Sequence, residues 1–475
     1  MVNDRTEATK HLKEIFVREL CEQKLDLQQF EKFVLKEGKK ILCEAMSGAL
    51  ENYDNELFAS HNREVKVKEK RAKTLASTLG DLTFKRRIYV DKYGNTEMPL
   101  DEKLDIGYRS RITPTAFEFL VIMASQVSYQ QSANSLAFFG GSQVSANTVM
   151  RAIHKTGLNC KNEDIKEAHE IYINGVLPDH GKEVAEVFVE ADGTYVSLQN
   201  GGKVEVKAMV AYAGKTEESR SQRIDPCRFG CVGTMTEFWS QSFSRFAQAY
   251  DITKIKNIHL GFDGEAKYKQ AEDYFLVNAK FDGNLDPYHL NRSVRACFGD
   301  NKDDYNQVMS CLWHNNPKDA ADMLESYSEF GVIDPQKAQI VARYIRNNSQ
   351  FIKTNEFTLG TMECEQEHMY KCRLAGVPRA WSVHGVDSIA RIRSRINSGI
   401  ELVFYGRYES IPEEVLKHRE EKVEEFFAKQ PIVYQLTSGH GYNYPYQASL
   451  NQKIKQGLCS SWSNYSKRTG GFDPY

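Results

Sequence analysis

Carboxylates at three distant places in the sequence could together bind divalent cations. Asp192 in "FVEADG" and Asp263 in "LGFDG" each follow an apolar segment and precede a glycine. Far downstream, Glu363 lies in "GTMECEQEHMYKCR", which also contains Glu365 and Glu367. Three carboxylates around one crevice can hold two divalent ions about 3.5–4 Å apart, an arrangement that serves phosphoryl transfer. Oxygen ligands of this kind suit Mg²⁺ or Mn²⁺.

Each of these acids also has a structural explanation. Asp-Gly is a common turn signal, so Asp192 and Asp263 could each simply begin a turn. Glu363 falls in the first turn of a predicted helix, where the helix dipole favours an anion. Glu367 shares a helix face with Glu363 and Glu365 points elsewhere, and such a like-charged pair costs roughly 0.2–0.5 kcal/mol unless a cation lies beside it. These residues alone leave both explanations open.

The length and composition indicate a soluble, multidomain protein. With 475 residues, the chain is long enough for two to four units. Hydrophobic residues at 41% and charged residues at 27% are typical of globular proteins and exclude a disordered or fibrous chain. We find no apolar run of about 18 residues and no signal-peptide pattern in the polar start "MVNDRTEATKHLKE", so we expect a cytoplasmic protein.

The ten cysteines are scattered, and we expect reduced thiols. Cys227 and Cys231 in "CRFGC" have a spacing that zinc sites sometimes use, but no partner pair is evident.

Basic residues are concentrated in two segments, although the net charge is only −2. Residues 61–90 and 371–395 each hold far more lysine and arginine than acid. Such patches fit a polyanionic partner, which binding to a phosphate backbone would provide. Solvated protein surface is the alternative explanation.

The N-terminal third combines helical and strand patterns. Apolar residues recur at three- and four-residue steps over 8–58, which predicts paired amphipathic helices. Residues 77–100 then alternate and contain "YGN", which predicts a β-hairpin. We expect its central basic residues, Lys85, Arg86 and Arg87, to contact DNA.

A helix-turn-helix is predicted next. A helix from Ser128 to Phe138 is followed by Gly140 and Gly141, and a second helix opens at the good N-cap residue Ser145. Many helical hairpins share this outline without binding DNA. On the second helix, Val149 and Ile153 would face inward, which leaves Asn147, Thr148, Arg151, His154 and Lys155 for a DNA groove.

Strands and helices alternate over residues 184–290, and 290–358 is entirely helical in pattern. We expect Asp192 and Asp263 at strand ends, where α/β folds present ligand-binding residues at the edge of a sheet. Residues beyond 408 begin as a charged helix and continue as a polar tail without an assigned role.

The order of motifs adds a family resemblance. "EADG", "GFDGEA", "LDPYH", "GTMECEQEHMYKCR" and "GVPRAWSVHG" together resemble the DDE transposases of bacterial insertion sequences. The likeness is greatest to the ISLre-type group, akin to Mutator-like and ISL-type elements, and covers about residues 75–395. It implies that Asp192, Asp263 and Glu363 form the catalytic, metal-binding triad. Glu363 is preferred to its neighbours because it lies three residues after Gly360, as the family pattern requires.

The resemblance implies an RNase H-like mixed-sheet core, α/β in class, with its acids on the first strand, the fourth strand and a flanking helix. We therefore expect four regions. They are an N-terminal helical region (1–75), a hairpin plus helix-turn-helix DNA-binding region (76–160), a catalytic core (180–400) with a helical insertion at about 290–358, and a C-terminal region (401–475).

Several further residues gain expected roles from the same resemblance. Asp286 and His289 match an aspartate-x-x-histidine signature, and His289 would contact the scissile phosphate or orient a metal-bound water. A histidine packed near a helix start is the alternative. Lys371 and Arg373 would hold DNA phosphates or form a charged surface, and Trp381 would stack on an exposed base or belong to the core.

The implied function is a transposase that binds element ends, cuts a phosphodiester and joins the 3′-OH to target DNA, with two Mg²⁺ or Mn²⁺ ions. Its expected partners are the terminal inverted repeats, the target duplex and further copies of itself, and its expected location is the nucleoid. Two alternatives remain: an RNase H-fold nuclease that cuts without joining, and a transposase-derived DNA-binding regulator without catalysis.

Overall fold

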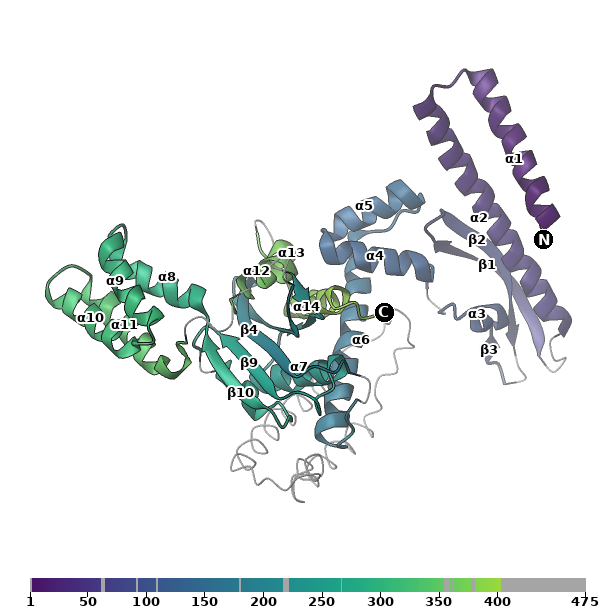
Figure 1. Ribbon diagram of the computed structural model, residues 1–475. Helices are drawn as coiled ribbons and strands as arrows, with labels where there is room; N and C mark the ends of the chain where they lie inside the picture. The colour runs from purple at the N-terminus through teal and green to yellow at the C-terminus, as the bar shows by residue number, and fades with distance from the viewer. Residues whose placement is uncertain are drawn as a thin grey trace. The chain divides into compact units, whose positions relative to one another are not determined.

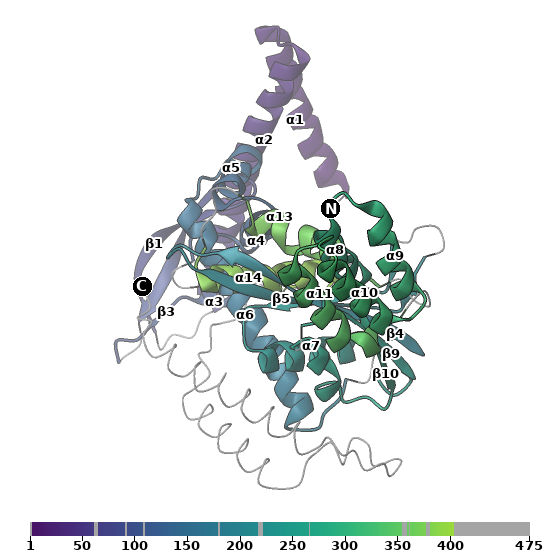
Figure 2. The same cartoon turned by 90° about the vertical axis from the view of Figure 1, so that its left-hand side faces the viewer.

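The computed structural model describes residues 2–60, 65–90, 93–107, 110–178, 181–216, 222–265, 267–353, 359–360, 362–376 and 381–402 (Figures 1 and 2). The chain forms two compact units, Met1–Ala152 and Ile153–Tyr475. The predicted C-terminal helix and tail lie outside the described residues. Among the helices that are described, none is long and apolar enough to cross a membrane.

The first unit begins with the predicted pair of helices. Helices α1 (Val2–Gln23) and α2 (Leu27–Ser60) form a hairpin, within which Phe16 packs edge-on against Phe30 and Phe33. A three-stranded antiparallel sheet follows, made of β1 (Lys66–Ala76), β2 (Asp81–Val90) and β3 (Thr96–Glu97). The main partner of β2 is therefore β1 rather than the segment after "YGN". Charged residues dominate β1, which hides the alternation that marks a strand.

Two of the three predicted DNA contacts on β2 are internal, which corrects the expectation of a basic surface there. Adjacent strand residues point to opposite faces of a sheet. At Arg86 and Arg87, both faces of β2 are covered by other parts of the unit. Arg86, 5% exposed, donates from Nε to Asp101 Oδ1 of α3 (Pro99–Lys103) at 2.7 Å. Arg87, 8% exposed, is also buried and forms an ion pair with Asp54 of α2. Lys85 alone is exposed.

The predicted helix-turn-helix is present. Helix α4 (Pro114–Gln126) precedes α5 (Tyr129–Gly140) and α6 (Ala146–Tyr172). A capping box of Ser128 and Gln131 begins α5, and Gly141 ends it in the left-handed conformation (φ 86°) that glycine adopts readily. Ser145 Oγ accepts the backbone N–H of Thr148 at 3.1 Å, which caps α6.

A five-stranded mixed sheet forms the centre of the second unit. It contains β4 (Glu186–Ser197), β5 (Lys203–Tyr212), β8 (Cys227–Cys231), β9 (Asn257–Phe262) and β10 (Lys280–Leu285). The strand order is β10-β9-β4-β5-β8. Strands β4, β9 and β10 are parallel, whereas β5 is antiparallel to both β4 and β8. The short strands β6 (Gly214–Lys215) and β7 (Arg223–Ile224) form a separate antiparallel pair.

Helices pack on this sheet and enclose the core. Helix α7 (Met235–Ala249) contributes Phe238, Trp239, Phe243 and Phe246, all fully buried. Helix α14 (Val383–Asn397) packs on β8 and β5. The thiols of Cys227 and Cys231 are free and buried on β8. A short 3₁₀ helix, η1 (Lys269–Asp273), precedes β10.

Arginines of the second basic segment are also buried. Arg391 and Arg395 of α14, with Arg245 of α7, surround Asp164 of α6. Burial alone would raise the pKa of Asp164, but these three guanidinium groups outweigh it and hold that pKa at about 2. The network therefore joins three helices inside the unit, and these arginines do not form the expected basic surface.

The predicted helical stretch after residue 290 consists of four helices, which Figure 1 shows as one group beside the sheet. They are α8 (Pro287–Phe298), α9 (Lys302–Trp313), α10 (Pro317–Glu329) and α11 (Pro335–Asn347), followed by η2 (Ser349–Phe351). The glutamate-rich segment then forms α12 (Met362–Gln366), a π-helical turn η3 (Glu367–Lys371) and α13 (Cys372–Leu374).

Candidate metal centre

The sheet brings the two predicted aspartates to the same level. Ala191 of β4 pairs in register with Phe262 of the parallel strand β9. The next residue in each strand direction is an aspartate, so Asp192 and Asp263 lie side by side. Asp192 Oδ1 accepts the N–H of Gly193 at 2.6 Å, and Asp263 Oδ1 accepts the N–H of Glu265 at 2.8 Å. These bonds use only the Oδ1 atom of each aspartate, which leaves Oδ2 for other partners.

A buried glutamate anchors the segment that carries Glu363. Glu190, 2% exposed, accepts the Tyr212 hydroxyl on Oε1 at 2.7 Å and the Gly360 N–H on Oε2 at 2.8 Å. Gly360 has φ +106°, a conformation that L side chains rarely adopt, and an added Cβ would lie 3.0 Å from Asp286 Oδ1. The start of α12 is therefore fixed against β4, which places Glu363 over the aspartates.

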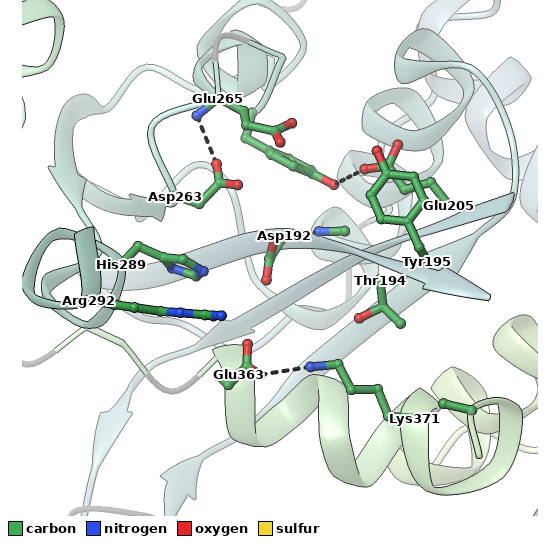
Figure 3. A pocket seen from close by; sticks show the side chains of 13 residues that line it. Asp192, Thr194, Tyr195, Glu205, Asp263, Glu265, His289, Arg292, Glu363 and Lys371 are labelled. Atoms are coloured by element: carbon green, nitrogen blue, oxygen red, sulfur yellow. Dashed lines mark hydrogen bonds and ion pairs between the residues drawn. The ribbon is translucent and has the colours of Figure 1, made fainter. Parts of the chain in front are cut away.

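His289 reaches the same place from the start of α8. Asp286 caps this helix, because its Oδ1 accepts the Tyr288 N–H at 3.0 Å. The other oxygen, Oδ2, lies 2.7 Å from His289 Nδ1. This contact uses one ring nitrogen and leaves Nε2 on the side of the carboxylates (Figure 3).

These side chains line one cavity of about 330 Å³. Ligand atoms of Asp192, His289 and Glu363 lie within 4.8 Å of one another, and the described residues hold no other such cluster of three or more potential metal ligands. Asp263 lines the cavity outside that cluster. Figure 3 shows the four side chains around a common space. The remaining lining residues are Gly193, Thr194, Tyr195, Glu205, Glu265, Tyr268, Arg292, Lys371 and Ala375.

The electrostatics of the cavity favour a cation. Burial, followed by the charges of Asp263 and Glu363, raises the pKa of Asp192 to about 6, against the opposing effects of Gly193 and His289. Burial also raises the pKa of Asp263. The hydrogen bond that the imidazole donates to Asp286 is the main cause that raises the pKa of His289. Burial is the first cause of the shifts at the two aspartates, and a divalent cation beside them would offset it by stabilising their charged forms. The donor set therefore fits Mg²⁺ or Mn²⁺.

Of the three glutamates in "GTMECEQEHMYKCR", only Glu363 lines the cavity. Glu365 is 8% exposed and forms ion pairs with Arg223 and Arg228, the latter at 2.8 Å from Nε. Glu367 is exposed at the start of the π-helical turn. Glu363, the glutamate expected from the resemblance, is therefore the one that lies beside Asp192 and Asp263.

The three other residues expected near DNA occupy different environments. Lys371 lines the cavity and donates to Glu363 Oε1 at 2.7 Å. Arg373 is 3% exposed, with its guanidinium 4.7 Å from the ring centre of Trp381. Trp381 is itself buried and donates from Nε1 to the Leu374 carbonyl at 3.0 Å. Arg373 and Trp381 are therefore packing partners, which corrects the roles expected of them, because this face of the segment turns into the core.

The second helix of the helix-turn-helix has the predicted inward and outward faces. Val149 and Ile153 are fully buried. The predicted outward residues Asn147, Arg151 and Lys155 are exposed, and Thr148 is partly so. His154 differs from the prediction, since its ring lies 4.5 Å from that of His384 on α14.

Several residues of the site were not singled out in the sequence. Glu190 and Glu205 lie on strands with mixed polar patterns. Only the folded structure shows that Glu205 lines the cavity and that Glu190 holds the segment carrying Glu363. Glu205 accepts Lys267 Nζ at 2.5 Å and the Tyr268 hydroxyl at 3.2 Å. Arg292 could have been found, because it lies one helical turn after His289.

The fold and the site define a mixed α/β protein with an acidic, histidine-containing cavity beside strands β4 and β9 of a five-stranded mixed sheet. The chain belongs to the uncharacterised protein family UPF0236, whose model matches residues 20–407.

Curated relatives extend over most of the chain. A UPF0236 protein of Caldanaerobacter subterraneus subsp. tengcongensis is 25% identical over 399 residues, which cover 81% of each chain. The name of this relative combines eleven gene designations, so the same protein is encoded many times in that genome. A UPF0236 protein in the vanSb 3′ region of Streptococcus gallolyticus is 23% identical over 394 residues, which cover 80% of this chain and 85% of the relative.

Proposed function

We propose that this protein is a DDE-type DNA transposase that binds element ends, cleaves a phosphodiester and transfers the 3′-OH to target DNA. The observation that carries the proposal is the convergence of Asp192, Asp263 and Glu363 on one cavity, although about 70 and 100 residues separate them in the sequence. Three carboxylates in one crevice are the arrangement that two-ion phosphoryl transfer uses.

The topology of the sheet supports an RNase H-like core. Such a core is expected to have its acids on the first strand, the fourth strand and a flanking helix. In chain order the five strands are β4, β5, β8, β9 and β10. Asp192 lies on the first of these, Asp263 directly follows the fourth, and Glu363 lies on α12, which packs on β4.

The carboxylates of Asp192, Asp263 and Glu363 would hold two Mg²⁺ or Mn²⁺ ions. When bound, such ions lower the pKa of an attacking water or hydroxyl and stabilise the leaving oxygen. The protein's own cations surround this place. Lys371 holds Glu363, and Arg292 enters the cavity from α8, where no ion pair or hydrogen bond engages it among the described residues. Both are positioned to hold phosphate oxygens of a DNA strand.

The family's gene multiplicity supports a mobile element. A protein encoded many times in one genome, as in the Caldanaerobacter relative, is expected when the gene spreads with the DNA that carries it. The expected partners are the terminal inverted repeats and target duplex, with the exposed residues Asn147, Arg151 and Lys155 of α6 as base and phosphate contacts. Two element ends must be cut together, so we propose a dimer or larger assembly on DNA in the nucleoid.

The test is Mg²⁺-dependent nicking and joining of a supercoiled plasmid that carries this gene with its native flanking DNA. The wild type is compared with Asp263→Asn and with Asp303→Asn, a matched change at an exposed acid on α9. We expect joined products from the wild type and Asp303→Asn, and none from Asp263→Asn. Cleavage without joining would indicate a nuclease. DNA binding without cleavage by any of the three, in Mg²⁺ and Mn²⁺ alike, would replace the transposase by a DNA-binding regulator.

A further inference from the structure

The cluster of potential ligands in the cavity differs from a set of three acids. The atoms that lie within 4.8 Å of one another belong to Asp192, His289 and Glu363, whereas Asp263 lies outside this group. All three clustered side chains are half-buried, so they face the cavity and still reach solvent. A cation placed among them would meet two carboxylate oxygens and one imidazole nitrogen.

The orientation of the imidazole is fixed from behind. Asp286 Oδ2 holds His289 Nδ1 at 2.7 Å, and Asp286 is itself held by the Tyr288 N–H and lies beside Gly360. Metal-binding histidines commonly use one ring nitrogen for a carboxylate behind them and the other for the metal. The Asp286–His289 pair has this form, and Figure 3 shows the ring directed toward the space between Asp192 and Glu363.

We propose that His289 is a direct metal ligand, which completes a site of two carboxylates and one histidine with Asp192 and Glu363. The inference rests on the proposed function for the identity of the reaction, but the ligand set stands on the geometry alone. A histidine binds a metal ion through an unprotonated ring nitrogen, and the contact of Nδ1 with Asp286 leaves Nε2 for this role. Asp263 then serves the second cation together with Asp192.

The ligand set has a consequence for metal choice. Mg²⁺ prefers oxygen ligands in octahedral geometry, whereas an imidazole nitrogen suits transition metals. Of the two ions that the acids accommodate, Mn²⁺ therefore gains more from His289 than Mg²⁺ does. This site selects Mn²⁺ over Mg²⁺, and the selection depends on the histidine.

The first measurement is pulsed electron paramagnetic resonance of the full-length protein loaded with Mn²⁺. A directly bound imidazole couples its nitrogen nuclei to the Mn²⁺ spin, which modulates the spin echo. We expect this nitrogen signal in the wild type and its change when the histidines are labelled with ¹⁵N, a control that needs no substitution. His289→Gln should remove the signal, and His314→Gln, at an exposed histidine that ends α9, should keep it.

The second measurement is the affinity for Mn²⁺ and Mg²⁺ by calorimetric titration of the same proteins without DNA. We expect His289→Gln to weaken Mn²⁺ binding on the order of 10–100-fold, the range seen even for residues that support a ligand, and to weaken Mg²⁺ binding much less. Circular dichroism checks that each variant is folded.

The outcomes separate this inference from the proposed function. Mn²⁺ binding without a nitrogen signal in the wild type would overturn ligation by His289, while the acids could still hold ions and cleave DNA. A nitrogen signal with no cleavage of any DNA would retain the ligand set and remove the transposase. Loss of Mn²⁺ binding in Asp192→Asn but not in His289→Gln would also count against the histidine.

Discussion

Two glutamates that are neighbours in sequence have opposite environments. Glu363 lines the cavity and pairs with Lys371, whereas Glu365 is buried between Arg223 and Arg228. A carboxylate in the cavity can be replaced without leaving a buried charge unpaired. A carboxylate inside the fold cannot, because its partners lose their counter-charge in a medium of low dielectric constant. The same substitution should therefore have different effects at the two positions.

Glu363→Gln should abolish DNA cleavage and leave stability nearly unchanged, because the residue is partly exposed and its side chain keeps its size. Glu365→Gln should lower the free energy of unfolding by about 3–5 kcal/mol, the usual cost of removing one partner of a buried ion pair. Urea denaturation and the plasmid assay, run on both variants, measure the two effects. A fully stable Glu365→Gln protein without cleavage would move the third acid by two residues.

Asp192 carries a second residue-scale prediction, because burial and neighbouring acids raise its pKa to about 6. The ionised form is the one that binds a cation, so metal affinity should rise with pH through this range and level off above it. Mn²⁺ titrations between pH 5 and 8 measure this dependence. An affinity that stays constant down to pH 5 would contradict it.

At the scale of elements, Glu190 of β4 supplies one of the contacts that position α12 against the sheet, and the ion pair of Glu365 with Arg228 of β8 supplies another. Glu190 accepts a hydrogen bond from Tyr212 on one oxygen and from Gly360 on the other. A leucine at this position could accept neither bond, whereas a glutamine could still accept from Gly360 and donate to the Tyr212 hydroxyl. With leucine, the start of α12 would lose this attachment to β4, and Glu363 would be held less firmly.

Glu190→Leu should therefore reduce cleavage and weaken Mn²⁺ binding, although Glu190 itself lies outside the ligand cluster. The unsatisfied Gly360 N–H should also cost about 1–3 kcal/mol of stability. Glu186→Leu is the matched control, since Glu186 is an exposed glutamate at the start of the same strand. Unchanged metal affinity in a folded Glu190→Leu protein would show that α12 is held by other contacts.

Helix α6 carries the prediction for DNA recognition. Arg151 is exposed on the outward face of the second helix of the helix-turn-helix. Arg151→Ala should weaken binding of the element's ends by about 1–3 kcal/mol if it reads a base. Arg18→Ala, at an exposed arginine of α1, serves as the control, and footprinting titration measures both. Equal affinities would argue against α6 as the recognition helix.

Local sequence patterns predicted where helices and strands form better than they predicted which elements and side chains pack together. The helix-turn-helix, the strand that ends before Asp263, and the helices after 290 depend on caps, glycines and periodicity that neighbouring residues supply. The expected strand end at Asp192 was wrong, because pairing with β5 continues β4 through Gly193 to Ser197. The burial of Arg86 and Arg391 depends on acids that lie elsewhere in the sequence, such as Asp101 and Asp164. An arginine that has a buried acid as its partner cannot be distinguished in sequence from one that binds DNA.

At the scale of the whole molecule, packing between helices from distant parts of the chain makes stability depend on pH at one histidine. His154 of α6 lies against His384 of α14, and nearby Asp387 and Lys161 also act on His384. Burial, followed by the charge of His384, lowers the pKa of His154 to about 4. The unfolded chain therefore binds a proton at this position between about pH 6.5 and pH 4 that the folded protein does not bind.

The contribution of His154 to stability should be complete above about pH 6.5 and should decrease as the pH falls toward 4. His154→Phe keeps an aromatic ring and removes the titration. Its unfolding free energy should therefore vary less between pH 7 and pH 4.5 than that of the wild type. Urea denaturation across this range measures the difference, and parallel pH profiles for the two proteins would exclude His154 as a source of the dependence.

The burial of arginines has a consequence for how DNA binding would respond to salt. Only a cation that meets a phosphate releases a counterion from DNA, and the number released sets the slope of affinity against salt concentration. Arg373, Arg391, Arg393 and Arg395 are each 4% exposed or less. These buried arginines would therefore release no counterions, and the slope would depend on exposed cations such as Lys85. Counting charges in the sequence would overstate how strongly salt dissociates the complex.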